Sequence, residues 1–389
     1  MASMKRTPTN DQDLYRTHNP STNDKIGFRE LIAIDFFLLG VKGTDTTVPF
    51  FYEFAGNAAW LMPLFIFLFI LPFVLLVSRL LARFEGKNLL IISEHLIGRP
   101  LTYLAAWVLF LLGMAATVLN TRSYTQMTGI MFYGRTPLIF LYAVILLATA
   151  YVAYRGLETI GRVASLLLPY ALFSIVLAFL GVYDIIDYRA IFPLFGQGWS
   201  VLPKTVTHLG FVVDIFYFAL FAGLLKSGSR TYQNATLIGT AMAGIGAMGL
   251  IFMYTGVFGY PAVNQVLFHY QQLTRIAHYG QFINHIEAAF LGTWILATVV
   301  HFAIYIYTMV YLLHYLVRAK DMFRLFVPIV AAIFFAGLYP YRSEKLFFTY
   351  REWIVWALTA TVYPYLLLLV LLSRTKGGKK RARKKTAYT

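Results

Sequence analysis

Long apolar runs recur along the whole chain and constrain its fold more than any other feature. Residues 60–78 and 137–154, for example, contain no charged side chain. A helix crosses the hydrocarbon core of a bilayer with roughly 20 apolar residues. Because lipid cannot satisfy backbone hydrogen bonds, an uninterrupted run of this length crosses as an α-helix. The sequence therefore predicts an all-α, polytopic membrane protein.

The runs divide the chain into ten expected transmembrane helices. Segments 88–97 and 259–284 are expected to hold short helices along the membrane interface. A polar arm, 1–25, is expected to be disordered; a single transmembrane domain, 26–374, and a basic tail, 375–389, follow it. No signal peptide is expected. The expected spans are 28–54, 60–82, 101–130, 137–154, 162–183, 201–225, 234–258, 286–317, 323–338 and 353–372.

Two of these spans are interrupted by residues that do not favour a continuous buried helix. The first breaks at 40–45, which reads GVKGTD, and the sixth at 210–214, which reads GFVVD. Broken helices at corresponding positions of two halves are typical of transporters built from inverted repeats. We therefore expect a LeuT/APC-like fold with a 5+5 inverted repeat, whose halves are residues 26–183 and 201–374.

The basic residues of the chain are distributed as membrane orientation requires. A net charge of +16 would suit a nucleic-acid partner, but the charges lie in short loops and one tail. With the N-terminus in the cytoplasm, 24 of the 33 Lys and Arg lie on the inner side and seven, including Arg351, in outer loops. This is the positive-inside pattern, so both termini are expected to be cytoplasmic and no nucleic-acid partner is expected. The tail either binds anionic lipid or only sets the orientation.

Composition and motifs exclude several kinds of site. The chain has no Cys, which rules out disulfides, thiolate metal sites and thiol nucleophiles. Its eight His are scattered, and it contains no HExxH, GxSxG or Walker motif. We therefore expect no enzymatic activity, no catalytic residues, no metal and no cofactor.

The two breaks supply the candidate ligand-binding residues. Gly40, Gly43 and Gly210 either let the backbone unwind toward a ligand or only let helices pack closely. Backbone N–H groups freed at the start of the outer half-helix can receive a carboxylate, assisted by the helix dipole. The expected ligand-binding set is Gly40, Lys42, Gly43, Thr44, Asp45, Gly210, Asp214 and Tyr217.

Four of the charged residues lie at or near the breaks. If the helix persists through the first break, Asp35, Lys42 and Asp45 share one face. An unpaired charge in the membrane is costly, so Lys42 is expected to pair with Asp45 or with Asp214. Asp214 either receives a substrate ammonium group or is only the structural partner of Lys42.

Further polar residues are candidates for a pathway or for a layer that supports the site. Arg122 on the third span either lines the pathway or extends to the lipid headgroups. His301 on the eighth span either relays protons or is a hydrogen-bonded packing residue. The expected set is Asp35, Asn120, Arg122, Thr298, His301 and Tyr305.

Four stretches of the sequence resemble one known family. They are RFEGKNLLIISEHLIG at 83–98; RELI at 29–32 with Leu39, Gly40 and Pro49; RGLETIGR at 155–162 with Pro169; and FPLFGQGW at 192–199 with the segment up to Lys226. Together they resemble the bacterial spore germination permease family. Its members are the B subunits of nutrient germinant receptors, within the amino acid–polyamine–organocation superfamily. The resemblance covers roughly residues 26–226 and continues beyond them only as hydropathy.

The resemblance implies a ten-helix inverted repeat whose central pocket senses an amino acid or a similar nutrient. It also implies partner A and C subunits in the spore inner membrane, with both termini on the spore-core side. Many relatives hold a sodium ion between spans one and eight, and Lys42 in that role would make the protein independent of sodium. Where the family often has Glu in span six, this chain has Asp214. The same scaffold also suits an amino acid permease with alternating access, or an ion- or water-conducting channel subunit.

Overall fold

The computed structural model describes residues 25–386 except for 197, 280–286 and 340–343, and its regular elements are helices. The α-helices are α1 (Phe28–Gly40), α2 (Val48–Ala55), α3 (Met62–Arg83), α4 (Leu89–Ile97), α5 (Arg99–Met131), α6 (Leu138–Tyr154), α7 (Leu157–Leu180), α8 (Val201–Thr207), α9 (Tyr217–Leu220), α10 (Gly228–Phe258), α11 (His269–Ile276), α12 (Glu287–Val317), α13 (Phe326–Gly337) and α14 (Glu344–Thr386). The 3₁₀ helices are η2 (Val41–Gly43), η3 (Gly56–Leu61), η4 (Tyr188–Ile191), η5 (Gly198–Ser200), η6 (Leu209–Phe216), η7 (Ala222–Leu224), η8 (Ala262–Gln265) and η9 (Phe323–Leu325).

Several of these helices are long and apolar enough to cross a membrane. Within the described residues there are six, and a bent pair, Gly198–Thr207 with Leu209–Leu220 at 45°, makes a seventh. The helices α6 and α13 are apolar but shorter. The structure therefore confirms an all-helical protein with several apolar spans, whereas the expected count of ten stays a prediction. The interfacial segments predicted at 88–97 and 259–284 contain the short helices α4 and α11.

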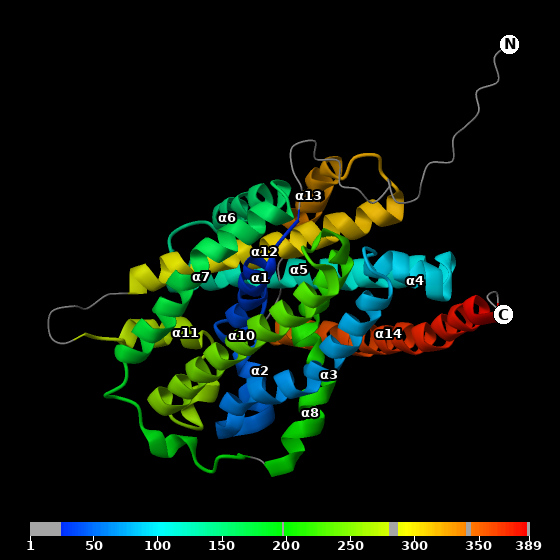
Figure 1. Cartoon of the computed structure of the whole chain (residues 1–389). Coiled ribbons are helices and arrows are strands. Elements are labelled where there is room, and N and C mark those ends of the chain that lie inside the picture. The colour runs from blue at the N-terminus through cyan, green and yellow to red at the C-terminus, as the bar shows by residue number, and fades with distance from the viewer. Residues whose placement is uncertain (1–24, 197, 280–286, 340–343, 387–389) are drawn as a thin grey trace.

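The helix α12 lies at the centre of the bundle. It packs against α5, α6 and α7, while α1 packs against α10 and α7 (Figure 1). In the apolar window of α12, 83% of the residues are buried, against 22% for the peripheral α7. Side chains on α12 can therefore contact both broken helices, which places this helix beside the candidate site.

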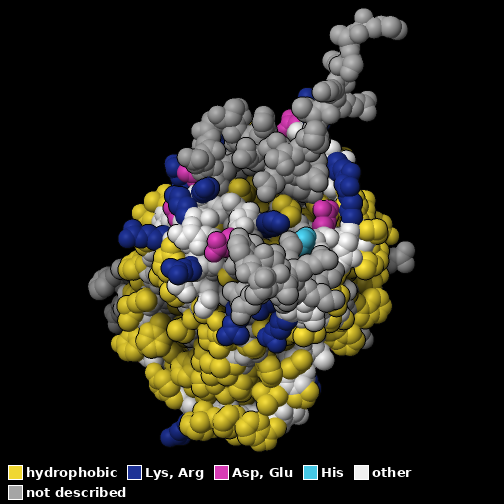
Figure 2. Space-filling view, turned by 45° about the vertical axis from the view of Figure 1, so that its right-hand side comes forward, with side chains coloured by type: hydrophobic (Ala, Val, Ile, Leu, Met, Phe, Trp, Pro, Cys, Tyr) yellow, Lys and Arg dark blue, Asp and Glu magenta, His cyan; other side chains and the backbone are white. Residues whose placement is uncertain are grey.

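The outer surface matches a lipid environment on its flanks. Figure 2 shows hydrophobic side chains covering the lower part of the molecule, while most of the Lys and Arg in this view lie above it. A hydrophobic flank with charges at an end is the distribution that a bilayer imposes. The predicted arm, 1–25, lies outside the described residues except for Lys25.

The starts of α1 and α10 are joined by backbone hydrogen bonds. The N–H of Ile26 donates to the carbonyl of Leu224 at 3.0 Å, and the N–H of Lys226 donates to the carbonyl of Ile26 at 2.9 Å. They form an isolated parallel β-bridge between Ile26 and Leu225. The segment entering the first broken span is thereby fixed to the segment leaving the second.

The last helix differs from the prediction at both ends. A span at 353–372 was expected, but α14 begins at Glu344 and continues as helix into the basic tail, through Thr386. Its early start moves Arg351 from an expected outer loop into a helix, where the residue is 5% exposed. The expectation failed because Arg351 and Glu352 lower the local hydropathy, although a buried partner compensates the arginine charge.

Candidate functional site

The first break forms where the sequence predicted it. The helix α1 ends at Gly40, one 3₁₀ turn follows, and α2 begins at Val48 with Pro49 in its first turn. Proline suits this place because the first-turn N–H groups of a helix have no partner within that helix. The Oδ1 atom of Asp45 accepts the N–H of Thr47 at 2.6 Å. A side-chain carboxylate therefore lies at the start of α2, where the helix dipole favours negative charge.

The second break is a 3₁₀ segment, η6, that follows the short helix α8. The backbone bends by 45° between these two elements. At the bend, the N–H of Gly210 donates to the hydroxyl of Thr359 on α14 at 2.7 Å. A Cβ atom at Gly210 would collide with the carbonyl oxygen of Val355, so only glycine permits this approach.

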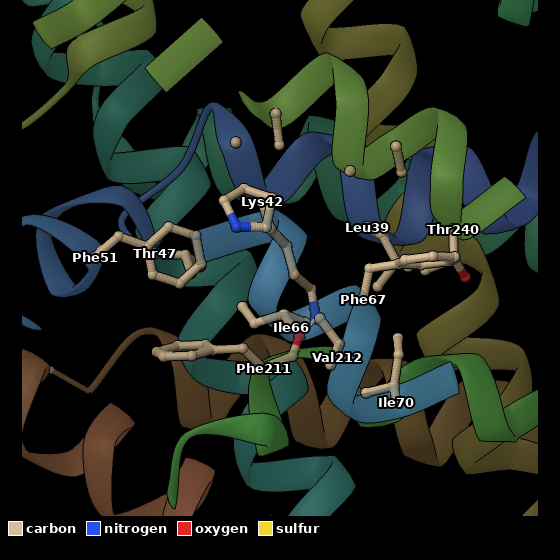
Figure 3. A pocket seen from close by; sticks show the side chains of 15 residues that line it. Leu39, Lys42, Thr47, Phe51, Ile66, Phe67, Ile70, Phe211, Val212 and Thr240 are labelled. Atoms are coloured by element: carbon tan, nitrogen blue, oxygen red, sulfur yellow. Dashed lines mark hydrogen bonds between the residues drawn. The ribbon is translucent and has the colours of Figure 1, made fainter. Parts of the chain in front are cut away.

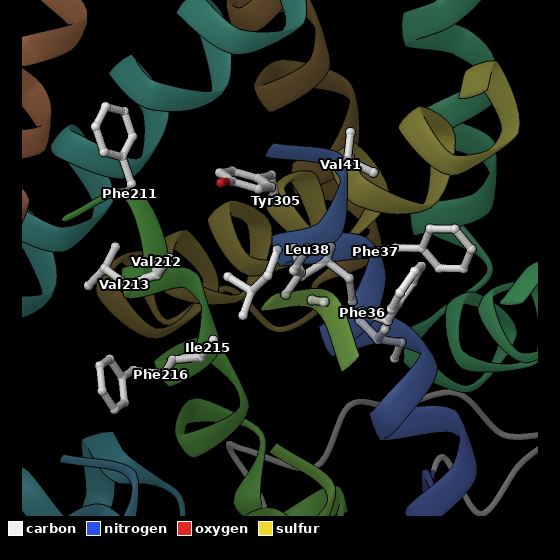
Figure 4. Close-up of a cluster of buried hydrophobic side chains, with 14 of the residues drawn as sticks. Phe36, Phe37, Leu38, Val41, Phe211, Val212, Val213, Ile215, Phe216 and Tyr305 are labelled. Atoms are coloured by element: carbon white, nitrogen blue, oxygen red, sulfur yellow. The ribbon is translucent and has the colours of Figure 1, made fainter. Parts of the chain in front are cut away.

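A buried ion pair joins the two breaks. The Nζ atom of Lys42 contacts the carboxylate of Asp214 and donates to the carbonyl of Phe211, both on η6. Tyr305 on α12 donates to the same carboxylate at 2.5 Å, and Figure 4 shows its hydroxyl directed toward η6. Lys42 is 9% exposed and Asp214 is 3% exposed. Buried charges of opposite sign must be paired and hydrogen-bonded in this way to be tolerated.

A second ion pair lies beside the first. Asp45 Oδ2 is 3.1 Å from Nη2 of Arg351 and accepts the hydroxyl of Tyr124 at 2.9 Å. Arg351 also donates to the hydroxyls of Thr46 and Thr47. The guanidinium lies over the ring of Phe211, at 5.5 Å from its centroid. This cluster joins α14 to the start of α2, so separating these helices would require breaking several charge-assisted hydrogen bonds.

Aromatic side chains fill the space between the breaks and α12. The rings of Tyr124 and Trp294 stack with centroids 5.3 Å apart. Trp294 donates its indole N–H to the hydroxyl of Thr44 at 3.0 Å. Nδ1 of His301 lies 3.2 Å from the carbonyl of Phe37, near the end of α1. Side chains from α5 and α12 thus close over the unwound segment.

A small cavity lies on the other side of Lys42, between α1, α3, η6 and α10. It has a volume of about 40 Å³, enough for one or two water molecules. Figure 3 shows Lys42 on its lining, with Phe211 on η6 and Thr240 on α10. The remaining lining residues are Leu39, Gly43, Thr47, Phe51, Pro63, Ile66, Phe67, Ile70, Val212, Ala243, Gly244 and Ala247.

Comparison with known proteins identifies the family. A sequence model of the spore germination proteins matches residues 31–345. The chain belongs to the spore germination protein family. No curated protein sequence is significantly similar to it. The matched region includes both breaks and most of the helices around them.

The fold of this spore germination protein is that of a LeuT-type transporter. Among 85 similar chains of known structure is the crystal structure of MhsT in complex with L-phenylalanine. The two share 16% sequence identity with a TM-score of 0.62 over 87% of each chain. At this identity the similarity establishes the fold alone. It agrees with the predicted superfamily and with the broken helices, but it assigns no ligand to this germination protein.

Of the predicted charge arrangement, one alternative is confirmed and another is wrong. Lys42 pairs with Asp214 rather than with Asp45. Asp35, Lys42 and Asp45 do not share one face, because the helix does not persist through the break. Asp35 instead faces α10, where it contacts Gly239 and accepts a hydrogen bond from Thr240.

The predicted glycines and their neighbours have mixed surroundings. Gly43 approaches Ala247 on α10 and its carbonyl accepts the hydroxyl of Tyr254 at 3.0 Å, so it has a packing role as well as lining the cavity. Gly40 ends α1 in ordinary contact with Phe36 of the same helix. The Thr44 hydroxyl accepts the indole N–H of Trp294. Tyr217 packs edge-on against the ring of Tyr305.

The supporting set is only partly gathered at the site. His301 and Tyr305 lie there, with direct contacts to α1 and η6. Thr298 donates to the carbonyl of Trp294 within its own helix at 2.8 Å. Asn120 and Arg122 are half-buried on α5. The described residues contain no group of three or more His, Asp or Glu that could hold a metal ion.

Sequence reasoning missed two main site residues. Arg351 was assigned to a loop, although an arginine seven residues after the start of a long apolar helix is a signal for a buried partner. Tyr124 on the third span was not among the expected site residues, although its hydroxyl donates to Asp45. The sequence signal that could have identified Tyr124 is its spacing. It shares one face of a helix with Thr117, Thr121 and Thr128.

Proposed function

We propose that this protein is a transporter-like nutrient sensor, a subunit of a spore germinant receptor whose ligand is an amino acid. The observation that carries the proposal is the contact of Lys42 with Phe211 and Asp214, which joins the two broken helices at their unwound centres. Family membership supports the germination role, and the transporter fold supports a small-molecule site at this position.

The chain's own charges occupy the positions that a zwitterion would use. The Lys42 ammonium group lies against the Phe211 carbonyl of η6 and a carboxylate, which is where an amino group would bind. The Asp45 carboxylate lies at the start of α2, where a ligand carboxylate would bind. An amino acid therefore competes with two internal ion pairs, and its binding exchanges protein–protein contacts for protein–ligand contacts.

This exchange provides a route from binding to signalling. The described conformation is closed, because the 40 Å³ cavity beside Lys42 is smaller than an amino acid. Binding therefore requires a conformation in which the ion pairs have opened. A ligand that binds only that conformation shifts the population toward it. Partner subunits can then detect the shift without any transport of the ligand.

The wider architecture of the proposal rests on the hydropathy of the sequence and on the resemblance to the germinant receptor subunits. It comprises ten spans in a 5+5 inverted repeat, with α6, α13 and the two broken helices each crossing the membrane. Both termini lie on the spore-core side of the spore inner membrane, and the partners are the A and C subunits. The excess of Lys and Arg in the segments assigned to the inner side, 24 of 33, supports this orientation.

The test measures ligand binding to the purified full-length protein in lipid nanodiscs. An amino acid panel is screened by thermal shift, and the affinity of each ligand found is measured by calorimetry. Asp214→Asn should weaken binding by roughly 10- to 100-fold, because a hydrogen bond to a charged group contributes about 1.5–3 kcal/mol. Glu158→Gln, which alters an exposed ion pair on α7, is the matched control. A panel without any stabilising amino acid, or an unchanged Asp214→Asn affinity, contradicts the proposal.

The transporter fold favours a second candidate function, an amino acid permease that works by alternating access. Uptake of radiolabelled ligand by reconstituted vesicles separates the two. Concentrative uptake would overturn the pure sensor, whereas binding without uptake supports it. Ion flux in the same vesicles tests the channel alternative.

Lys42 also gives a test of sodium dependence. If its ammonium group replaces a bound sodium ion, the wild-type germinant response needs no sodium and Lys42→Met loses the response in sodium-free medium. An unchanged response of Lys42→Met in that medium contradicts this role. The described partners of Lys42 lie on η6, which favours the structural ion pair as the competing explanation.

A further inference from the structure

A second polar cluster lies in the contact between α1 and α10, away from the charge pairs at the breaks. Asp35 contributes the carboxyl group from α1. On α10, Tyr232, Thr236 and Thr240 follow one another at intervals of four residues, and Thr240 donates to Asp35. That spacing places three hydroxyls on one face of a helix. Asp35, Tyr232 and Thr236 are all 0% exposed.

Most of the polar atoms in this cluster are unpartnered. Asp35 Oδ2 accepts a long hydrogen bond from Thr240, at 3.4 Å. Asp35 Oδ1, the Tyr232 hydroxyl and the Thr236 hydroxyl have no hydrogen-bond partner among the described residues. Buried polar groups are nearly always satisfied, so three unpartnered atoms in one contact indicate that something is missing from it.

The helix contact is shaped to hold the carboxyl group there. A Cβ atom at Gly239 would lie 2.6 Å from Cβ of Asp35 and 3.0 Å from the carbonyl of Ile32. Glycine at this position therefore lets α1 approach α10 closely enough to enclose Asp35. The enclosure leaves the carboxyl group fully buried, with the Thr240 hydroxyl as its hydrogen-bond donor.

No cation neutralises this carboxyl group within the described residues. From η6, Asp214 is the group that interacts electrostatically with Asp35, and it is itself an acid paired with Lys42. From α12, His301 is bonded to the Phe37 carbonyl. On α7, the charged residues Glu158 and Arg162 pair with each other at the exposed start of the helix. From α10, Thr240 donates to the carboxyl group and Tyr232 interacts with it electrostatically.

We propose that Asp35 is a proton-binding site in the membrane interior, held as a neutral carboxylic acid in the contact between α1 and α10. A neutral carboxylic acid keeps an acceptor oxygen for the Thr240 hydroxyl and carries no charge that needs a counter-ion. An ionised carboxylate would be a buried charge without a counter-ion. A proton neutralises the carboxyl group without further ligands, whereas a metal cation would need several converging oxygens, and the hydroxyls of Tyr232 and Thr236 form no hydrogen bond with Asp35.

The proton can exchange through the neighbouring cavity. Thr240 contacts Asp35 and also lines the 40 Å³ cavity beside Lys42 (Figure 3). When α1 and α10 separate, water reaches the carboxyl group, which then ionises and releases its proton to water. When they close again, the carboxylate takes one proton back. Opening and closing of this contact are thereby coupled to protonation, whatever ligand the breaks bind.

Infrared difference spectroscopy of the full-length protein in lipid vesicles tests the proposal without any ligand. At neutral pH the wild type should show the C=O stretch of a protonated, buried carboxylic acid. Asp35→Asn, which imitates the neutral acid, should fold normally and lose that band. Glu30→Gln, which changes a carboxyl group on the same helix that accepts the Gly27 N–H at 3.1 Å, should retain it.

Three results overturn the proposal. One is the absence of the band from the wild type, and another is its persistence in Asp35→Asn. The third is its loss when sodium or potassium chloride is added at constant pH, which would assign the site to an alkali metal ion. If Asp35→Asn does not fold, Thr240→Val decides the question. Removal of the hydroxyl that donates to this carboxyl group should shift the band frequency, and an unshifted band contradicts the assignment of the band to Asp35.

Discussion

Asp35 and Asp45 lie on one membrane segment, ten residues apart, and both are buried, but their surroundings are opposite. Asp45 has an arginine, a tyrosine hydroxyl and a backbone N–H within hydrogen-bonding distance. Asp35 has one threonine at 3.4 Å. The comparison shows two ways in which a membrane helix keeps an acid. One compensates the charge with distant partners, and the other removes the charge.

The difference also separates two roles. The hydrogen bonds and the ion pair of Asp45 hold the start of α2 against α14. The stability of this contact therefore depends on an intact ion pair between Asp45 and Arg351. The Asp35 contact contains no ion pair in the described residues and depends instead on close packing and on protonation state. Variants that remove a partner should therefore affect the two acids very differently.

The largest effect is expected from removing the partner of Asp45. Arg351→Met leaves a buried carboxylate without its counter-ion, which costs about 3–5 kcal/mol of the free energy of unfolding. Unfolding by SDS titration in mixed micelles measures the loss. Arg324→Met is the matched control, because its ion pair with Asp321 is exposed and contributes at most about 1 kcal/mol. Equal losses in the two variants would show that Asp45 does not depend on its arginine.

His269, on the short helix α11 outside the spans, is like Asp35 a buried titratable side chain with an unpartnered polar atom. Its Nε2–H donates to the Val263 carbonyl at 3.0 Å, whereas Nδ1 has no partner among the described residues. Burial lowers the pKa of His269 from 6.5 to about 4, so the folded protein keeps the ring neutral. The unfolded chain therefore binds the proton first. The stability contribution is present above pH 6.5 and is lost as the pH falls toward 4, by up to about 3 kcal/mol.

The pH dependence of the unfolding free energy checks this expectation. His269→Gln cannot titrate, and its stability should change less than the wild-type stability across the same pH range. His278→Gln serves as control, since that ring is exposed and near Asp184. An identical pH profile for His269→Gln and the wild type would weaken the argument that burial keeps groups such as Asp35 neutral.

Gly239→Ala tests the packing on which the Asp35 contact depends. The added methyl group overlaps Asp35 and the Ile32 carbonyl, and such overpacking costs about 1–3 kcal/mol. The higher helix propensity of alanine offsets up to about 1 kcal/mol of this. Gly249→Ala, on the same helix with nothing within 4 Å of the added Cβ, should be neutral or stabilising. A neutral Gly239→Ala would show that α1 does not rest closely on α10.

The smallest effect is expected from Asp35→Asn. It replaces a neutral acid by a neutral amide of the same shape, so the free energy of unfolding should change by less than about 1 kcal/mol. Asp45→Asn should cost about 3–5 kcal/mol, because it leaves Arg351 as an unpaired buried charge. The same SDS titration measures both. A large loss for Asp35→Asn would mean that Asp35 is ionised and compensated.

Much of the fold could be predicted from the sequence, because lipid imposes simple rules. Apolar length located the long helices, and the glycines and charges at 40–45 and 210–214 located both breaks. The start of the last helix was predicted wrongly, because Arg351 and Glu352 lower the hydropathy of the segment that contains them. In the structure, Arg351 pairs with Asp45, which compensates its charge. Hydropathy averages a window and contains no information about distant partners.

The site was predicted in part for the same reason. Local spacing identified Lys42, Asp45 and Asp214, but it could not assign the pairs. The partner of Asp45 lies 306 residues away, and the partner of Lys42 lies 172 residues away. The prediction that Asp35, Lys42 and Asp45 share one helical face was wrong. A 3₁₀ turn changes the angular spacing between residues, so helical periodicity no longer relates Asp35 to Asp45.

The β-bridge between Ile26 and Leu225 has a mechanical consequence. It is made of two backbone hydrogen bonds and ties the entry of the first broken span to the exit of the second. The bridge thus joins the start of α1 to the end of the second broken span, while both breaks are held on α14, one by Asp45 with Arg351 and the other by Gly210 with Thr359. Motion of α1 is transmitted to the second span through main-chain hydrogen bonds, which only a substitution by proline would remove. Movement of either segment would therefore reach the other.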